Sequence, residues 1–376
     1  MALSVGSIAS IVAQVPAGAL VDELPGKRIV TGAALLAISA AMLILISLPS
    51  RWPVFGAEAL QGVAGAVITP AVAAITLALA NEEKLGERLG ENVRSRALGS
   101  GLTALLMGSL GSWLGYSSVF YLGAGFGLLA ILAMGMIRPE CLETAPDRTG
   151  AFSAVPKRRQ HDLSCGRADL LKNRQLLLFV AAIMLFQLGN AAVLNIAANG
   201  FLKGNANSAG VLLAATIAVS QVIAALIAPQ LGNLAESWGR RRVLLIGFSL
   251  VPIRILLFAL GGTAWMEVGY QAFDGVTAAV LGLMIPLVVS DITHDSGRFS
   301  LAMGFVGLAV GAGATLSTTI AGFVAERVGD QAAYLTLAAF AVAAAAMVWF
   351  AVPETRERRT RLKAGAVEAG AVAATP

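Results

Sequence analysis

Long apolar runs, separated by short polar or glycine- and proline-containing breaks, follow one another along the whole chain. Each run is about 18 to 27 residues long, the length that an α-helix needs to cross about 30 Å of hydrocarbon. Continuous apolar runs of this length differ from the pattern of a soluble helix, in which one face stays polar. The pattern predicts eleven membrane-spanning helices, over residues 1–21, 28–48, 53–80, 97–115, 118–138, 174–201, 208–232, 242–261, 264–290, 299–323 and 331–352.

Composition also indicates an integral membrane protein. Apolar residues make up 57% of the sequence and charged residues 13%, whereas a soluble domain carries about 25% charged residues. The mean hydropathy is +0.77. Backbone groups exposed to hydrocarbon must be satisfied within the segment itself, so spans of this length are expected to be helices. The expected fold class is therefore an all-α membrane protein.

Lysine and arginine gather in alternate loops between the predicted spans. Loops rich in these residues stay on the cytoplasmic side, so we expect a multi-pass protein of the cell (inner) membrane with a cytoplasmic C-terminus. The net charge of +5 then reflects topology. Nucleic-acid binding is not expected, because the charges are dispersed over short loops. The cytoplasmic set contains Lys27, Arg28, Lys84, Arg88, Arg94, Arg96, Arg240, Arg241, Arg242 and Arg298, a cluster between residues 157 and 174, and the tail from Arg356 to Lys363.

Residues 139–173 form a long polar stretch, rich in Pro, Asp, Ser and Arg, with no apolar period. We interpret it as a cytoplasmic central loop between an N-terminal helical bundle (1–138) and a C-terminal six-helix bundle (174–352). A cytoplasmic tail at 353–376 is expected to be disordered. Cys141 and Cys165 lie in the central loop on the reducing side, so no disulfide is expected. His161 and His294 also lie in loops, and we expect neither a metal site nor another cofactor.

An internal repeat relates the two bundles. The segment from Gly18 to Arg28 returns between Gly232 and Arg242, and the two first glycines are 214 residues apart. Tandem repeats of this kind are typical of transporters built from two parallel halves. Moved back by the same distance, the span at 174–201 would fall before Met1. We therefore expect that the first of twelve helices is missing, through truncation or a mis-started reading frame.

The two repeated loops share the pattern Gly-x-Leu-x-Asp/Glu followed by Gly and two basic residues, and they resemble the signature loop of the major facilitator superfamily. The resemblance implies two six-helix bundles that rock to expose a central substrate alternately to each side. It also implies that the loops latch the transporter between states. The alternative is that their basic residues only anchor the topology. The residues implied in gating are Gly18, Asp22, Gly26, Lys27, Arg28, Gly232, Glu236, Gly239, Arg240 and Arg241.

Three carboxylates lie inside predicted spans, where charge is costly and therefore suggests function. Asp274 and Glu58 occupy nearly equivalent places in the two halves, and Glu267 precedes Asp274 by two turns on the same helix face. A carboxyl group in a medium of low dielectric can hold a proton and release it when the site becomes wet. We therefore expect proton or cation coupling at these three residues. The alternative is a static pair with Arg254 or a hydrogen-bonded structural carboxyl group. Glu58 also departs from the family pattern, which has a basic residue at this place.

Uncharged amide side chains inside the spans suit a cavity at the membrane midplane that binds a polar or amphipathic solute. The alternative for each is a hydrogen bond between helices. The residues expected to line the cavity are Gln14, Gln61, Gln187, Asn190 and Gln221.

The sequence contains no phosphate-binding Gly-x-x-x-x-Gly-Lys-Ser/Thr loop and no Ser/His/Asp constellation, so neither ATP hydrolysis nor another enzymatic activity is expected. We predict a secondary transporter, working as a monomer in the lipid bilayer, that couples efflux of a small organic solute to protons or another ion. One alternative is uptake or exchange of a metabolite by the same fold. Another is a non-transporting membrane protein or an inactive truncated fragment.

Overall fold

The computed structural model describes residues 2–24, 26–48, 50–79, 85–136, 170, 172–204, 206–293 and 296–355. Over these ranges the chain forms helices and no strand, which confirms the all-α fold. The predicted central loop lies almost wholly outside the described residues, as does the tail after Thr355. The helices are α1 (Ala2–Glu23), α2 (Lys27–Ser47), α3 (Arg51–Leu79), α4 (Leu85–Leu114), α5 (Tyr116–Met136), α8 (Arg174–Asn190), α9 (Val193–Gly204), α10 (Ala206–Trp238), α11 (Arg240–Leu260), α12 (Ala264–Thr293), α13 (Phe299–Val328) and α14 (Asp330–Ala351).

Ten spans in the described ranges are long and apolar enough to cross a membrane, with α8 and α9 counted together as one. Helix α4 contains the remaining predicted run and begins with charged turns that precede it. The apolar run at 97–115 predicted only its second half, and the helix begins at Leu85. Arg88, Arg94 and Arg96 therefore lie on a helix and not, as predicted, in a loop.

The span predicted at 174–201 is interrupted. Helix α8 ends at Asn190, and α9 begins at Val193. The backbone N–H of Ala192, freed by the break, donates a buried hydrogen bond of 3.1 Å to the Ser317 hydroxyl oxygen on α13. A break inside a membrane span is tolerated where a neighbouring helix supplies the missing partner in this way.

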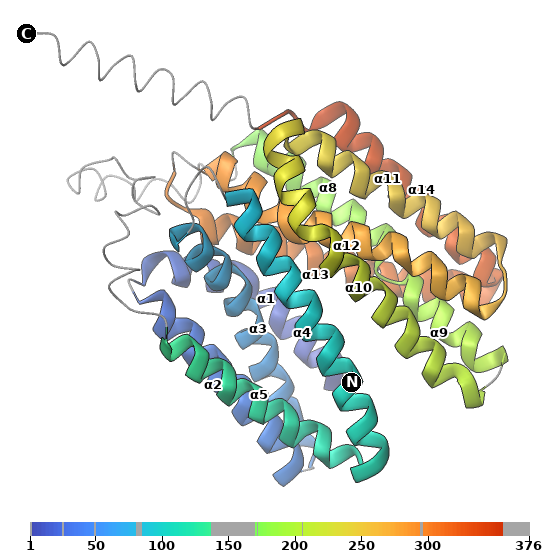
Figure 1. The fold of residues 1–376 in the computed structure, drawn as a ribbon, viewed down its shortest axis with the longest axis horizontal. Helices are drawn as coiled ribbons and strands as arrows, with labels where there is room; N and C mark the ends of the chain where they lie inside the picture. The colour runs from blue at the N-terminus through green and yellow to red at the C-terminus, as the bar shows by residue number, and fades with distance from the viewer. Residues whose placement is uncertain are drawn as a thin grey trace, which may run out of the picture.

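The helices form two groups (Figure 1). The first group contains α1 to α5, coloured blue to green, and the second contains α8 to α14, coloured green to red. In the first group α3 packs against α1 and α2, and α5 packs against α2 and α4. In the second group α8 packs against α13 and α14, while α12 packs against α10 and α11. The groups meet through two helix pairs, α1 with α13 and α4 with α10. We call the end of the molecule at which α1 and α10 finish and α4 and α13 begin the gate end.

The two helix pairs are repeats of one interface. A Cβ atom added to Gly90 on α4 would lie 2.6 Å from the Ala228 carbonyl oxygen on α10. A Cβ added to Gly304 on α13 would lie 2.5 Å from the Gln14 carbonyl oxygen on α1. Gly90 and Gly304 are 214 residues apart, as are Gln14 and Ala228. Glycine thus lets backbones approach closely at equivalent places in both halves.

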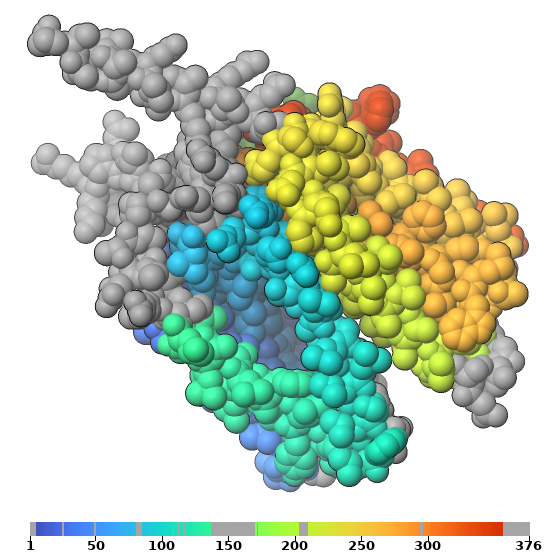
Figure 2. Space-filling model, in the orientation of Figure 1, coloured from blue at the N-terminus to red at the C-terminus, as the bar shows by residue number. Residues whose placement is uncertain are grey.

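A single buried apolar cluster crosses between the two groups. Leu89 and Val93 of α4 belong to the same cluster as Leu283 and Leu287 of α12. Figure 2 shows α4 (cyan) against α10 (yellow) near the gate end, while a notch separates the two groups toward the opposite end. The molecule is therefore closed at the gate end.

Candidate functional site

The carboxylate of Asp22, at the end of α1, binds the first turn of α13 across the boundary between the two groups. It accepts hydrogen bonds from the backbone N–H groups of Ser300 (2.9 Å) and Leu301 (2.8 Å). The first N–H groups of a helix have no partner within the helix, and the N-terminus carries a partial positive charge. A carboxylate from another helix satisfies both needs, so Asp22 ties the two groups together at the gate end.

Glu236, the repeat equivalent of Asp22, makes the reciprocal contact. Its carboxylate accepts a hydrogen bond of 3.1 Å from the backbone N–H of Gly86, in the first turn of α4. Gly86 and Ser300 are also 214 residues apart, so each half caps a helix of the other half at the equivalent place. We call these two contacts the reciprocal caps.

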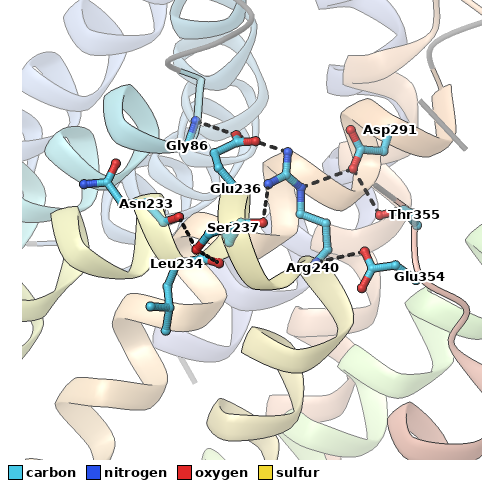
Figure 3. A network of polar contacts seen from close by, with 10 residues as sticks. Gly86, Asn233, Leu234, Glu236, Ser237, Arg240, Asp291, Glu354 and Thr355 are labelled. Atoms are coloured by element: carbon cyan, nitrogen blue, oxygen red, sulfur yellow. Dashed lines mark hydrogen bonds and ion pairs between the residues drawn. The ribbon is translucent and has the colours of Figure 1, made fainter. Parts of the chain in front are cut away.

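Arg240 joins one reciprocal cap to a second acid in Figure 3. Its guanidinium, only 2% exposed, lies 3.2 Å from the Glu236 carboxylate and 3.4 Å from that of Asp291 at the end of α12. It also donates to the Ala235 carbonyl oxygen at 2.8 Å. A buried arginine with two acids and a carbonyl fixes the positions of α10, α11 and α12 at the gate end.

The segment after α14 completes this network (Figure 3). Glu354 accepts hydrogen bonds from the backbone N–H groups of Arg240 (2.9 Å) and Arg241 (3.0 Å), and so caps α11. The Thr355 hydroxyl donates to the Asp291 carboxylate at 3.0 Å. Gly239 has φ +100°, and a Cβ there would lie 2.6 Å from a Glu354 oxygen, so glycine is required on both counts.

A second polar cluster lies within the second group of helices, deep in the predicted membrane region. Arg254 of α11 forms an ion pair with Asp274 of α12. It also donates to the side-chain oxygens of Asn190 (2.6 Å) and Gln271 (3.1 Å), and the Ser220 hydroxyl donates to Asp274 at 2.9 Å. The side chain of Arg254 is 4% exposed and that of Asp274 is 28% exposed. We call these five residues the Arg254 cluster.

The Arg254 cluster is incompletely satisfied. Arg254 Nε and Gln271 Nε2 are buried and find no hydrogen-bond partner among the described residues. Buried polar atoms are nearly always paired, so each exception calls for an explanation. The structure shows the pair of Asp274 with Arg254 that the sequence offered as the alternative.

The remaining predicted coupling residues lie apart from this cluster. Glu58 is half-buried on α3, where a Cβ added to Gly6 of α1 would lie 2.9 Å from its carboxylate. Glu267 is half-buried at the other end of α12 from the gate, near Tyr334. In the described ranges neither carboxylate makes a hydrogen bond or ion pair with the Arg254 cluster.

The predicted cavity residues lie in different environments. Asn190 belongs to the Arg254 cluster. Gln14 lies against Gly307 and Gln187 against Gly313, both on α13, while Gln221 lies against Gly101 on α4. Gln14 and Gln221 therefore sit where the two groups of helices meet. Gln61 lies within the first group, with a buried Nε2 atom that has no partner among the described residues.

The basic gating residues do not act alike. Arg28 donates to the Gly135 carbonyl oxygen on α5 at 2.8 Å, and Arg241 donates to that of Trp349 on α14, so both bind within their own half. Lys27 is close enough to Asp22 to interact with it electrostatically.

The glycines of the two repeated loops lie close to other backbones or at helix ends. Gly18 and Gly232 lie against the backbones of Ser300 and Gly86, beneath the reciprocal caps. Gly26 precedes α2 as its N-cap residue.

Comparison with known proteins decides the family. The family model described as Major Facilitator Superfamily matches residues 1–203 and 179–374. The chain belongs to the major facilitator superfamily. An uncharacterized transporter of this superfamily from Mycobacterium tuberculosis (strain CDC 1551 / Oshkosh) is 32% identical over 361 residues, which cover 96% of this chain and 86% of the relative. The superfamily's fold and membership show a multi-pass membrane transporter and not an enzyme.

Two further proteins are similar to this chain. The class B tetracycline resistance protein of Escherichia coli is 32% identical over 154 residues, or 41% of this chain and 37% of that protein. The solved proton:xylose symporter XylE superposes with a TM-score of 0.72 over 94% of this chain and 85% of its own, at 14% identity, which shows a shared fold.

Sequence reasoning missed four residues of the gate network: Asp291, Glu354, Thr355 and Gly86. For Glu354 a signal was present, because Pro353-Glu354 repeats Pro139-Glu140 at the 214-residue spacing. Asp291 and Gly86 carry no such mark. Their roles come from the ends of distant helices meeting in space, which no local pattern encodes.

Proposed function

We propose that this superfamily member is a proton-coupled exporter of a small organic solute, and that Asp274 carries the proton. The observation that supports this most is the Arg254 cluster, an ion pair within a membrane helix bundle whose acid is partly exposed and whose base is buried. An ionisable pair in this position is expensive to maintain and is by default a functional hypothesis.

The mechanism follows from the charges of the pair. When Asp274 binds a proton, it loses its charge, and Arg254 keeps only neutral partners, Asn190 and Gln271. Arg254 then sits in a low-dielectric site without a counter-ion, which favours a rearrangement of α11 against α12. Release of the proton restores the pair. Protonation thereby biases one of two arrangements of the second bundle, and that bias is what coupling requires.

The reciprocal caps supply the gate in this proposal. They hold the two halves together at the gate end, and the lysine and arginine distribution supports a cytoplasmic location for that end. The arrangement described here is then open toward the outside and closed toward the cytoplasm. Breaking the two caps lets the halves part at the gate end, so that the solute site changes sides.

The direction and the kind of solute rest on similarity. The matching segment of a tetracycline resistance protein supports efflux, but it covers less than half of this chain. The alternative to efflux is uptake of the solute by the same fold. Since the amides at the boundary of the two halves are uncharged, a small organic solute with polar groups suits the space between them.

The test is solute-driven proton movement in inverted membrane vesicles that contain the full chain. Wild type is compared with Asp274→Asn and with Glu326→Gln, an exposed carboxylate near the outer end of α13. We expect at least one solute in a panel of organic cations, organic anions and sugars to dissipate the pH gradient with wild type and Glu326→Gln, but not with Asp274→Asn. Equal dissipation by Asp274→Asn would remove this residue from the coupling step. Dissipation only when solute and protons move in the same direction would replace efflux with uptake.

A further inference from the structure

Arg96 of α4 lies between the two halves and not in a loop. Asn92, four residues before Arg96, forms a hydrogen bond with Thr76 on α3. Val93, three residues before Arg96, is buried at the contact with α12. Residues at these spacings share a helix face. The Arg96 side chain accordingly projects into the angle between α3 of the first half and α12 of the second half.

The guanidinium of Arg96 reaches the backbone of α12 at Gly282. A Cβ atom added to Gly282 would lie 2.5 Å from Arg96 Nη2 and 3.1 Å from a methyl group of Val93. Any larger residue at this position would displace the guanidinium. The absence of a side chain at Gly282 thus makes room for a cation that belongs to the opposite half.

Arg96 lacks the acidic partner that Arg254, Arg240 and Arg94 each have. Arg254 pairs with Asp274, Arg240 with Glu236 and Asp291, and Arg94, two residues away, lies 3.7 Å from Glu91. Over the residues that the structure describes, Arg96 makes neither a hydrogen bond nor an ion pair. It follows Leu89 and Val93, which belong to the apolar cluster that closes the gate end, on the same face of α4.

We infer that Arg96 binds an oxyanion group, a carboxylate or a phosphate, of the transported solute. This inference rests on the proposed transport function and names its substrate class. A guanidinium presents paired N–H donors that match the two oxygens of such a group, and a cation inside a membrane protein is stabilised by an anion. Because the group would touch α4 and α12 together, its binding and release would be linked to the relative position of the two halves.

Equilibrium binding to the purified full chain in lipid nanodiscs tests the inference. Four probes share one ring and differ in charge: benzoate, phenyl phosphate, benzamide and benzylammonium. We expect benzoate, phenyl phosphate or both to raise the unfolding temperature of wild type, with benzamide and benzylammonium without effect. Which of the two anions binds distinguishes a carboxylate site from a phosphate site.

Variants then assign the effect to Arg96. Arg96→Gln is expected to weaken anion binding at least about tenfold, whereas Arg94→Gln, the matched control on the same helix, keeps the wild-type affinity. Gly282→Ala keeps every charge but displaces the guanidinium, and should also weaken binding.

Unchanged binding by Arg96→Gln, equal binding of neutral and anionic probes, or no anion binding to wild type would each overturn the inference. If an organic cation dissipates the pH gradient through Asp274 while no anion binds, only this inference fails. If anions bind through Arg96 and no solute moves protons, only the proposed coupling fails.

Discussion

Removing one member of a buried ion pair leaves the other charge without a counter-ion in a medium of low dielectric. For Arg254 and Asp274 this consequence is large, because Arg254 is nearly inaccessible and its other partners are neutral amides. Replacing both charges is far less costly than replacing one, since no isolated charge then remains. The energetics of this pair can therefore be separated from its role in transport.

Asp274→Asn is expected to lower the free energy of unfolding by about 2 to 4 kcal/mol, somewhat less than for a fully buried pair because Asp274 is partly exposed. The double variant Arg254→Gln, Asp274→Asn should recover much of this loss. Both values come from unfolding in mild detergent, with Glu326→Gln as the exposed control. A double variant less stable than Asp274→Asn would show that Arg254 does not suffer from its lost counter-ion.

The reciprocal caps predict a different kind of change, in accessibility. Asp22→Ala and Glu236→Ala each remove acceptors worth about 0.5 to 2 kcal/mol at a helix N-terminus, which corresponds to about 2- to 30-fold in the population open at the gate end. The readout is labelling of Val93→Cys by a water-soluble maleimide after Cys141→Ser and Cys165→Ser. Glu91→Ala, on the exposed side of α4, should leave labelling unchanged. Labelling that stays at the wild-type rate in both cap variants would favour topological anchoring as the sole role of these loops.

At this scale the sequence identifies individual groups better than their partners. Asp22 and Glu236 stand out because their surroundings repeat, but a repeated acid beside lysine and arginine suggests an ion pair. The structure shows that Asp22 caps a helix of the other half. Likewise, the sequence predicts that Arg96 is a basic loop residue, and only the structure shows that α4 begins before it. Partners that come from distant helices cannot be inferred from local patterns.

Among the elements, apolar length predicts most spans because crossing a bilayer imposes a minimum length on every helix. It does not predict the beginning of α4, whose charged turns extend beyond the apolar run, or the break between α8 and α9. That break depends on Ser317, far along the chain, accepting a hydrogen bond from Ala192. The glycines of the two helix pairs carry a repeat signal, yet only the structure shows which of them face another backbone.

A glycine comparison tests the element contacts. Gly90→Val and Gly304→Val should force α4 from α10 and α13 from α1, because even a Cβ would approach a carbonyl oxygen to 2.6 or 2.5 Å. Gly99→Val, on the same α4 helix, meets nothing within 4 Å and serves as the control. We expect the first two variants to increase maleimide labelling of Val93→Cys at the gate end and the control to leave it unchanged. Similar labelling of all three would mean that the close approaches do not hold the halves together.

For the whole molecule, the repeat has a mechanical meaning. Each half caps a helix of the other half at the same place, so neither half can move away from the gate end without breaking both caps. The Arg254 cluster, by contrast, belongs to one half only. The proposed transporter is therefore symmetric in its gate and asymmetric in its coupling site. The effect of proton binding must reach the gate through two helices that each contribute to both places. Helix α11 carries Arg254 and Arg240, and α12 carries Asp274 and Asp291.

The central claim is that Asp274 carries the coupled proton, and the most direct test compares two modes of transport by one variant. In reconstituted vesicles, Asp274→Asn should still exchange labelled for unlabelled solute across the membrane, because exchange needs the gate but no net proton movement. The same variant should fail to accumulate solute against its gradient when a pH difference is imposed, whereas wild type does both. Accumulation by Asp274→Asn at the wild-type level would contradict the account.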